Sequence, residues 1–323
     1  MRESWLKEIV NKLGRDHIGK RIFIVVFLIC ILGVIFKGML VTSWGPSGNY
    51  ENYSVRTTVN VTNSYPEILN ITCNGDNPIT LTAGSTQLVT CIVEIRDYNG
   101  WDDVISVNGT FYHYLNESSD SDDNNTHYTN SSCTQGSNDG QYLVNWTCSY
   151  DVWYYAVNGT WEANSTVNDS YSTIDNDFGN ASISALLALN VTDVIDFGQL
   201  AVTETSPTPV EANVTNFGNV PINVSVWGYG GNESVAGAGF AMLCAIRNIT
   251  LPNERYSLNS GDAYNVMTPI TGASVTIPGL KIEKQTLSSA LSVNSTYWRL
   301  HINLTTNPFG ICNGTLVFAA EAP

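Results

Sequence analysis

The chain has 323 residues, only 13% of them charged, and a formal net charge of −15. From residue 38 onward, seven Lys or Arg residues stand against 26 Asp or Glu residues. Nucleic-acid binding needs a basic patch that replaces the counterions of the phosphates, so this charge balance argues against a nucleic-acid partner.

The first predicted element is a membrane span near the N-terminus. Residues 22–36 form an unbroken apolar run, and after Lys37 the apolar character continues to Val41. A helix over residues 22–41 would cover the roughly 30 Å of a bilayer core. A lysine near the end of such a span can reach the headgroups with its ammonium group.

The basic residues fix the expected orientation of this span. Six of the 14 Lys and Arg residues lie in positions 1–21, ahead of the apolar run. The positive-inside rule therefore places residues 1–21 in the cytoplasm and the bulk of the chain outside the cell. We predict an uncleaved signal-anchor over residues 22–44, with membrane lipid as its partner. The alternative is a long signal peptide whose removal releases a secreted protein.

Beyond residue 45, short runs rich in Val, Ile, Thr, Tyr and Trp alternate with turn sequences. Candidate strands in the first half are residues 55–62, 68–73, 88–95, 109–115, 142–150 and 160–167. Those in the second half are residues 188–194, 210–215, 222–227, 239–246, 274–277, 298–304 and 316–320.

This spacing predicts an all-β ectodomain of two tandem antiparallel β-sandwich domains, residues 45–180 and 181–323. The polar stretch 169–180 is predicted to be the linker between them, or a long loop that runs into it. One weak helical pattern covers residues 281–291.

The cysteines predict three disulfides. Cys30 lies in the apolar run, and six cysteines remain on the oxidising side of the membrane, namely Cys73, Cys91, Cys133, Cys148, Cys244 and Cys312. With the boundary at residue 180, Cys244 and Cys312 are the only two cysteines of the second domain and should pair with each other. The four cysteines of the first domain can pair in three ways. We predict Cys91–Cys148 and Cys73–Cys133, because Cys91 and Cys148 lie mid-strand among apolar neighbours, where a bridge would join facing sheets. Buried free thiols are the alternative.

Sites for N-glycosylation are abundant. Asn-x-Ser/Thr sequences without proline at x occur 20 times, all after residue 50, which is about threefold more than 35 Asn and 60 Ser or Thr residues predict. We predict glycans on the outer side of the membrane. The alternative is that a β-rich, Asn-rich composition inflates the number. Candidate sites are Asn52, Asn60, Asn70, Asn108, Asn145, Asn158, Asn190, Asn213, Asn223, Asn303 and Asn313.

No motif in the chain indicates catalysis. The sequence holds no Gly-rich phosphate loop, no GxSxG elbow, no HExxH and no dinucleotide fingerprint. We therefore predict no enzymatic activity, no catalytic residue and no bound cofactor. Oxygen ligands for Ca²⁺ occur at Asp120, Asp122 and Asp123 and in residues 99–103 (NGWDD). The spacing of an EF-hand is missing, so solvated loops are the default interpretation.

Two stretches of the ectodomain resemble a known family. The first is LTAGST at residues 81–86, which leads into Val89-Thr90-Cys91. The second is IDFGQL at residues 195–200 followed by VTNFGNVPI at residues 214–222. Both resemble archaeal cell-surface proteins built from tandem immunoglobulin-like modules. The resemblance implies domains whose role is display and spacing. It carries over no binding residues, since the tyrosine that antibody-type domains place two residues before the second cysteine is Trp146 here.

The sequence thus predicts a membrane-anchored, N-glycosylated cell-surface protein with a structural or adhesive role. Surface proteins and glycans are its candidate partners. The alternatives are an extracellular carbohydrate- or calcium-binding module, or a secreted form. Exposed Trp and Tyr gathered on one face would favour the binding module, whereas buried aromatic residues would favour the structural role.

Overall fold

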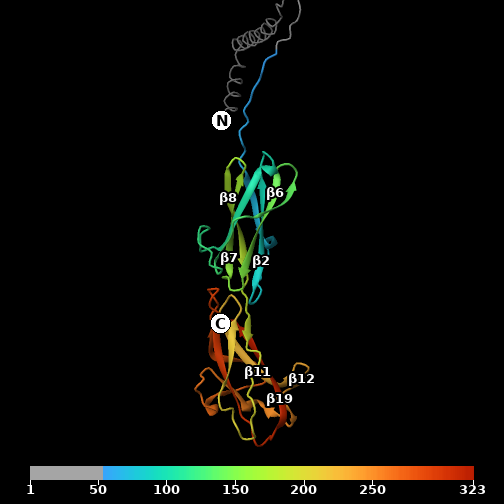
Figure 1. Cartoon of the computed structure of the whole chain (residues 1–323), viewed down its shortest axis with the longest axis vertical. Helices are drawn as coiled ribbons and strands as arrows, with labels where there is room; N and C mark the ends of the chain where they lie inside the picture. Colours follow the sequence, from blue (N-terminus) through green and yellow to red (C-terminus); the bar gives the residue numbers. More distant parts are fainter. Residues whose placement is uncertain (1–53) are drawn as a thin grey trace, which may run out of the picture. The chain divides into compact units, whose positions relative to one another are not determined.

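A computed structural model describes residues 54–323 (Figure 1). The predicted cytoplasmic segment 1–21, the predicted span 22–44 and Asn52 lie outside these residues. Within residues 54–323, no helix is long and apolar enough to cross a membrane. Residues 54–61 contain no helix or strand, and Thr62–Pro323 form one compact unit.

The first half of this unit consists of two antiparallel four-stranded sheets, named here the N-terminal sandwich (Figure 1). The strand orders are β1-β2-β6-β5 and β4-β3-β7-β8. The elements are β1 (Glu67–Cys73), η1 (Asn74–Asp76), β2 (Thr86–Arg96), η2 (Trp101–Asp103), β3 (Val104–His113), β4 (His127–Asn130), β5 (Thr134–Asp139), β6 (Leu143–Trp153), β7 (Gly159–Asp169) and β8 (Ile174–Ile183).

In the central strands of the N-terminal sandwich, buried and more exposed side chains alternate, and the buried ones form its core. In β6 every second side chain is buried, namely Val144, Trp146, Cys148, Tyr150 and Val152. Successive side chains of a strand point to opposite faces, so one face of this strand meets the core. Phe111 of β3 and Trp161 of β7 stack there, with their ring centroids 4.8 Å apart.

The second half of the unit, the C-terminal sandwich, encloses a separate core between two further sheets. Their strand orders are β16-β15-β18-β10-β9 and β12-β11-β19-β13-β14, and β17 also pairs with β11. The elements are β9 (Leu189–Val191), β10 (Val210–Asn216), β11 (Ile222–Asn232), β12 (Val235–Gly237), β13 (Phe240–Ile246), β14 (Ile249–Thr250), η3 (Leu251–Asn253), β15 (Glu254–Ser257), η4 (Tyr264–Val266), β16 (Thr268–Pro269), β17 (Val275–Ile282), β18 (Val293–Leu300) and β19 (Phe309–Glu321).

The all-β prediction is confirmed, but three local predictions are wrong. Residues 169–180 are not a linker, because Ile174–Ile183 forms β8 and pairs along its whole length with β7. Its polar side chains suit an edge strand, where Asn176 donates cross-strand hydrogen bonds to Asn164 (2.9 Å) and Thr166 (2.8 Å). The predicted helix at 281–291 is the end of β17 followed by irregular chain, and residues 55–62 are not a strand.

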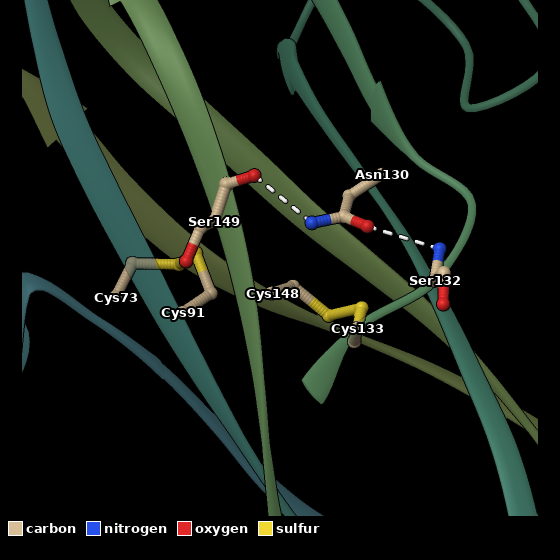
Figure 2. Close-up of a disulfide and its surroundings, with 7 residues drawn as sticks. All are labelled: Cys73, Cys91, Asn130, Ser132, Cys133, Cys148 and Ser149. Atoms are coloured by element: carbon tan, nitrogen blue, oxygen red, sulfur yellow. Dashed lines mark hydrogen bonds between the residues drawn. A yellow bond between two sulfur atoms is a disulfide. The ribbon is translucent and has the colours of Figure 1, made fainter. Parts of the chain in front are cut away.

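The predicted pairing of the first four cysteines is also wrong. The disulfides are Cys73–Cys91 and Cys133–Cys148 (Figure 2). Cys91 and Cys148 are partners in neighbouring strands of one sheet, and do not face each other from opposite sheets. The third disulfide, Cys244–Cys312, agrees with the prediction.

The register of the sheet explains this pairing. Cys73 lies opposite Cys91, which lies opposite Cys148, and Cys133 directly precedes β5 beside β6. The four cysteines therefore form one row across β1, β2, β6 and the residue that precedes β5. A Cys91–Cys148 bridge would leave the outer two separated by three strand spacings, roughly 14 Å, which is beyond the reach of a disulfide. Asn130 holds the Cys133 segment against β6 by donating to Ser149 O at 3.0 Å (Figure 2).

The two sandwiches contact each other through buried side chains within the compact unit. Tyr154 directly follows β6; its hydroxyl donates a hydrogen bond to Gln285, and its ring packs edge-on against Phe217 with centroids 5.5 Å apart. Lys284 donates to Tyr155 O at 3.1 Å. Burial lowers the pKa of Lys284 to about 8.

Candidate metal centre and the surface around it

Three carboxylates from separate parts of the chain meet at one end of the N-terminal sandwich. Asp97 directly follows β2, Asp103 ends η2 and Asp169 ends β7. One oxygen from each lies within 4.8 Å of the others. The cluster draws on both sheets, because β2 belongs to one and β7 to the other. Asp97 and Asp169 are fully buried, and Asp103 is half-buried.

Local turns hold the three side chains in place. Asp97 accepts the Asn99 N–H at 2.8 Å, and Ser170 donates its hydroxyl to Asp103. Asp169 accepts the backbone N–H groups of Tyr171 (3.0 Å) and Thr173 (2.7 Å). Such turns are typical of Asp, whose side chain readily accepts a hydrogen bond from a backbone N–H two or more residues later in the chain.

A residue from outside the acidic loops completes the group. The Asn63 amide donates to Asp169 Oδ2 at 2.6 Å. The next residue, Ser64, donates its N–H to Asn99 Oδ1 at 2.6 Å. Residues 63–64 are thereby bound to the same loops that carry the carboxylates.

The polar atoms of this group are incompletely satisfied. Asp97 Oδ2, Asp103 Oδ2 and Asn63 Oδ1 are buried without a hydrogen-bond partner. Among residues 54–323, no Lys, Arg or His nitrogen lies within 4.0 Å of any of the three carboxylates. Buried charges in proteins are normally paired or bound to a metal. The cluster therefore carries negative charge that the described residues do not balance.

The pKa values of the two buried carboxyls move in opposite directions. Burial raises the pKa of Asp97, and the neighbouring Asp103 and Asp169 raise it further. Burial also acts to raise the pKa of Asp169, but hydrogen bonds from Thr173, Asn63 and Tyr171 outweigh it, so this pKa lies below its usual range. The arrangement favours a charged Asp169 beside an Asp97 that is costly to ionise without a cation.

The structure does not bring together the predicted candidates Asp120, Asp122 and Asp123. Asp120 accepts the Glu117 N–H at 2.9 Å, and Asp122 pairs with His127 Nδ1 at 2.8 Å. Asp123 caps the next turn by accepting the N–H of Thr126 at 2.6 Å. Each carboxylate is directed to a different part of its own loop.

Sequence reasoning found only part of the cluster. The segment 99–103 contains Asp103 and was a candidate for Ca²⁺ ligands, whereas Asp97 and Asp169 were missed. Asp169 falls in the stretch that the sequence assigned to a linker. Recognising that stretch as the end of one strand and the start of another would have indicated that Asp169 lies at the same end as the 97–103 loop.

Exposed tyrosines surround the cluster. Tyr65, Tyr98 and Tyr171 lie within two residues of Asn63, Asp97 and Asp169, and Tyr142 accepts the backbone N–H of Asp97. The exposed fractions of these four side chains run from 40% to 69%. The rings of Tyr98 and Tyr142 are 5.8 Å apart. Large exposed aromatic rings are characteristic of contact surfaces. By contrast, none of the six tryptophans in the described part of the chain is exposed.

A second unusual group lies in the C-terminal sandwich. Glu254, at the start of β15, is 3% exposed and lines a cavity of about 640 Å³ together with Met242 and Phe318. An adjoining cavity of about 570 Å³ shares part of this lining. Burial raises the pKa of Glu254 to about 8. No ion pair to this carboxyl occurs within residues 54–323.

Sequence comparisons assign no family to the chain: no family model matches it, and no curated protein matches it significantly. Similar solved structures include a carbohydrate-binding module of the β-sandwich superfamily, at 11% identity and a TM-score of 0.24 over 81% of this chain and 99% of that one. A DUF4466 family protein from Parabacteroides merdae matches at 10% identity and a TM-score of 0.23, over 74% of this chain and 100% of that one.

A third similar structure is the secreted serine protease VesC from Vibrio cholerae. It matches at 7% identity and a TM-score of 0.18, over 78% of this chain and 51% of that one. At such low TM-scores, none of the three likenesses bears on what this chain does.

Proposed function

We propose that this chain is a membrane-anchored, N-glycosylated cell-surface protein with a structural or adhesive role and no catalytic activity. The observation that carries the proposal is the exposure of the sequons. Of the candidate glycosylation sites within residues 54–323, none has a buried asparagine. Seven are exposed, and Asn145, Asn223 and Asn303 are half-buried. Three disulfides agree with an oxidising compartment.

The immunoglobulin-like resemblance is part of this proposal, and the strand order supports it. Sheets ordered β1-β2-β6-β5 and β4-β3-β7-β8 correspond to A-B-E-D and C′-C-F-G of an immunoglobulin sandwich. Buried tryptophans support a structural role. The three disulfides would suit a module that keeps its fold outside the cell.

The anchor and the glycans can be tested together. We expect the full-length chain, made in cells that glycosylate secreted proteins, to stay in the membrane pellet after carbonate extraction. Glycosidase treatment should lower its mass by several glycans, and external protease should digest the ectodomain. A matched variant without residues 22–41 should be absent from the pellet. If the product of the full-length gene is soluble, or starts near Trp44, the anchor is contradicted; if it carries no glycan, the glycosylation is contradicted.

A second candidate function, glycan binding, is favoured by the exposed tyrosines around the acidic cluster. Tyrosine offers an apolar ring face for stacking together with a hydroxyl that can hydrogen-bond, and both suit a sugar ligand. We expect Tyr98→Ala to weaken binding to a glycan array severalfold. Tyr114→Ala is the matched control, since Tyr114 is 51% exposed but lies away from the cluster at the end of β3. Equal binding by both variants, or no binding by the wild type, would contradict glycan binding at these tyrosines and would leave the structural role as the proposed function.

A further inference from the structure

We propose that Asp97, Asp103 and Asp169 form a calcium site at the end of the N-terminal sandwich. Two observations carry this. The first is the convergence of three carboxylate oxygens within 4.8 Å, the span across which oxygens bound to one Ca²⁺ ion lie. The second is that Asp97, which is fully buried, keeps one carboxylate oxygen without any partner.

Calcium matches the donor set better than other common metals. All the available donors are oxygens, and no Cys or His belongs to the group, which argues against zinc. Ca²⁺ accepts six to eight oxygens at about 2.3–2.6 Å in flexible geometry. Mg²⁺ requires a tighter octahedron and keeps most of its waters, so a site that already excludes water around Asp97 and Asp169 suits it less.

The Asn63 amide supplies a further oxygen. Its Oδ1 is buried and unpartnered, while its Nδ2 donates to Asp169, so the amide group lies against the cluster. Rotation of the amide by half a turn would offer Oδ1 in place of Nδ2 without moving the backbone. With the three carboxylates, Asn63 Oδ1 makes four candidate ligands, and Asp103 Oδ2 is an oxygen of that set that has no hydrogen-bond partner. Together these atoms account for most of a Ca²⁺ coordination shell, with waters or backbone carbonyls completing it.

Ca²⁺ at this position would connect three parts of the fold. Asp97 directly follows β2, Asp103 directly precedes β3 and Asp169 ends β7, and β2 lies in the sheet that faces the sheet of β3 and β7. Through Asn63 the ion would also hold residues 63–64, which lead into β1. Without a cation, three neighbouring carboxylates repel one another. The site would therefore make the stability of this end of the sandwich depend on calcium.

The test is calorimetric and thermal titration of the full-length chain in detergent with CaCl₂, and with MgCl₂ for comparison. We expect Ca²⁺ to bind and to raise the unfolding midpoint by about 5 °C at saturating concentration. Asp103→Asn should weaken Ca²⁺ binding at least about tenfold. Asp102→Asn is the matched control, since Asp102 is the exposed neighbour outside the cluster, and it should bind like the wild type.

A measurement in EDTA separates ligation from a merely structural role. Asp103→Asn removes one of three like charges, so without calcium its unfolding midpoint should equal or exceed that of the wild type. With calcium, its midpoint should fall below the wild-type value. The proposal is overturned if Ca²⁺ leaves the wild type unchanged, if Asp102→Asn loses as much affinity as Asp103→Asn, or if Asp103→Asn is equally destabilised in both conditions.

Discussion

Glu254→Gln is expected to raise the free energy of unfolding by about 4 kcal/mol at pH 8 and by less than about 1 kcal/mol at pH 5. Burial raises the pKa of Glu254 from an ordinary 4.5 to about 8. Between these values the folded chain keeps a proton that the unfolded chain releases. The free energy of unfolding therefore falls as the pH rises from about 4.5 to about 8, and it stays low at higher pH.

Glutamine carries no charge at any pH, so the variant should lack this decrease. Urea denaturation of both proteins at pH 5 and pH 8 measures the difference. Glu233→Gln is the matched control, because Glu233 is an exposed glutamate of the same sandwich. A Glu254→Gln variant that is less stable than the wild type at pH 8 would show that the carboxylate has a favourable partner in the cavity. That result would direct attention to the cavity as a ligand site.

Removing the Cys244–Cys312 bridge by the double substitution Cys244→Ala/Cys312→Ala is expected to lower the free energy of unfolding by about 4 kcal/mol. This bridge closes a loop of 68 residues, whereas Cys73–Cys91 and Cys133–Cys148 close loops of 18 and 15 residues. The entropy that a cross-link removes from the unfolded chain grows with loop length, so each shorter bridge should contribute about 3 kcal/mol.

Guanidinium denaturation of the three double variants ranks these contributions. Cys30→Ala serves as a control, since Cys30 lies in the predicted membrane run and is expected to have no disulfide partner. Loss of the 68-residue loop should cost more than loss of the 15-residue loop. A smaller cost for Cys244→Ala/Cys312→Ala would mean that the unfolded C-terminal sandwich is already compact before the bridge constrains it.

The strands themselves could be predicted from the sequence. Residues 88–95, 142–150 and 160–167 lie within or next to β2, β6 and β7, because period-two burial and β-branched composition are local signals. The strand β8 was missed for the opposite reason. It is an edge strand with few apolar residues, and its pairing with β7 depends on a neighbour that its own composition does not reveal.

The disulfides and the acidic cluster required the tertiary structure. The sequence shows that Cys91 and Cys148 lie mid-strand, but only the strand order puts them side by side in one sheet with Cys73 and Cys133 at the two ends of the row. The same holds for Asp97 and Asp169, which are far apart in the chain and meet because β2 and β7 end at the same end of the sandwich.

The sequence by itself therefore determined the all-β class, the number of disulfides within residues 54–323 and the abundance of sequons, whereas the tether stays a prediction. Each of these depends on composition or on short-range periodicity. The tertiary structure decided which cysteines pair, which carboxylates converge and which aromatic rings reach the surface. These depend on strand order and register, which are set by contacts between segments distant in the chain.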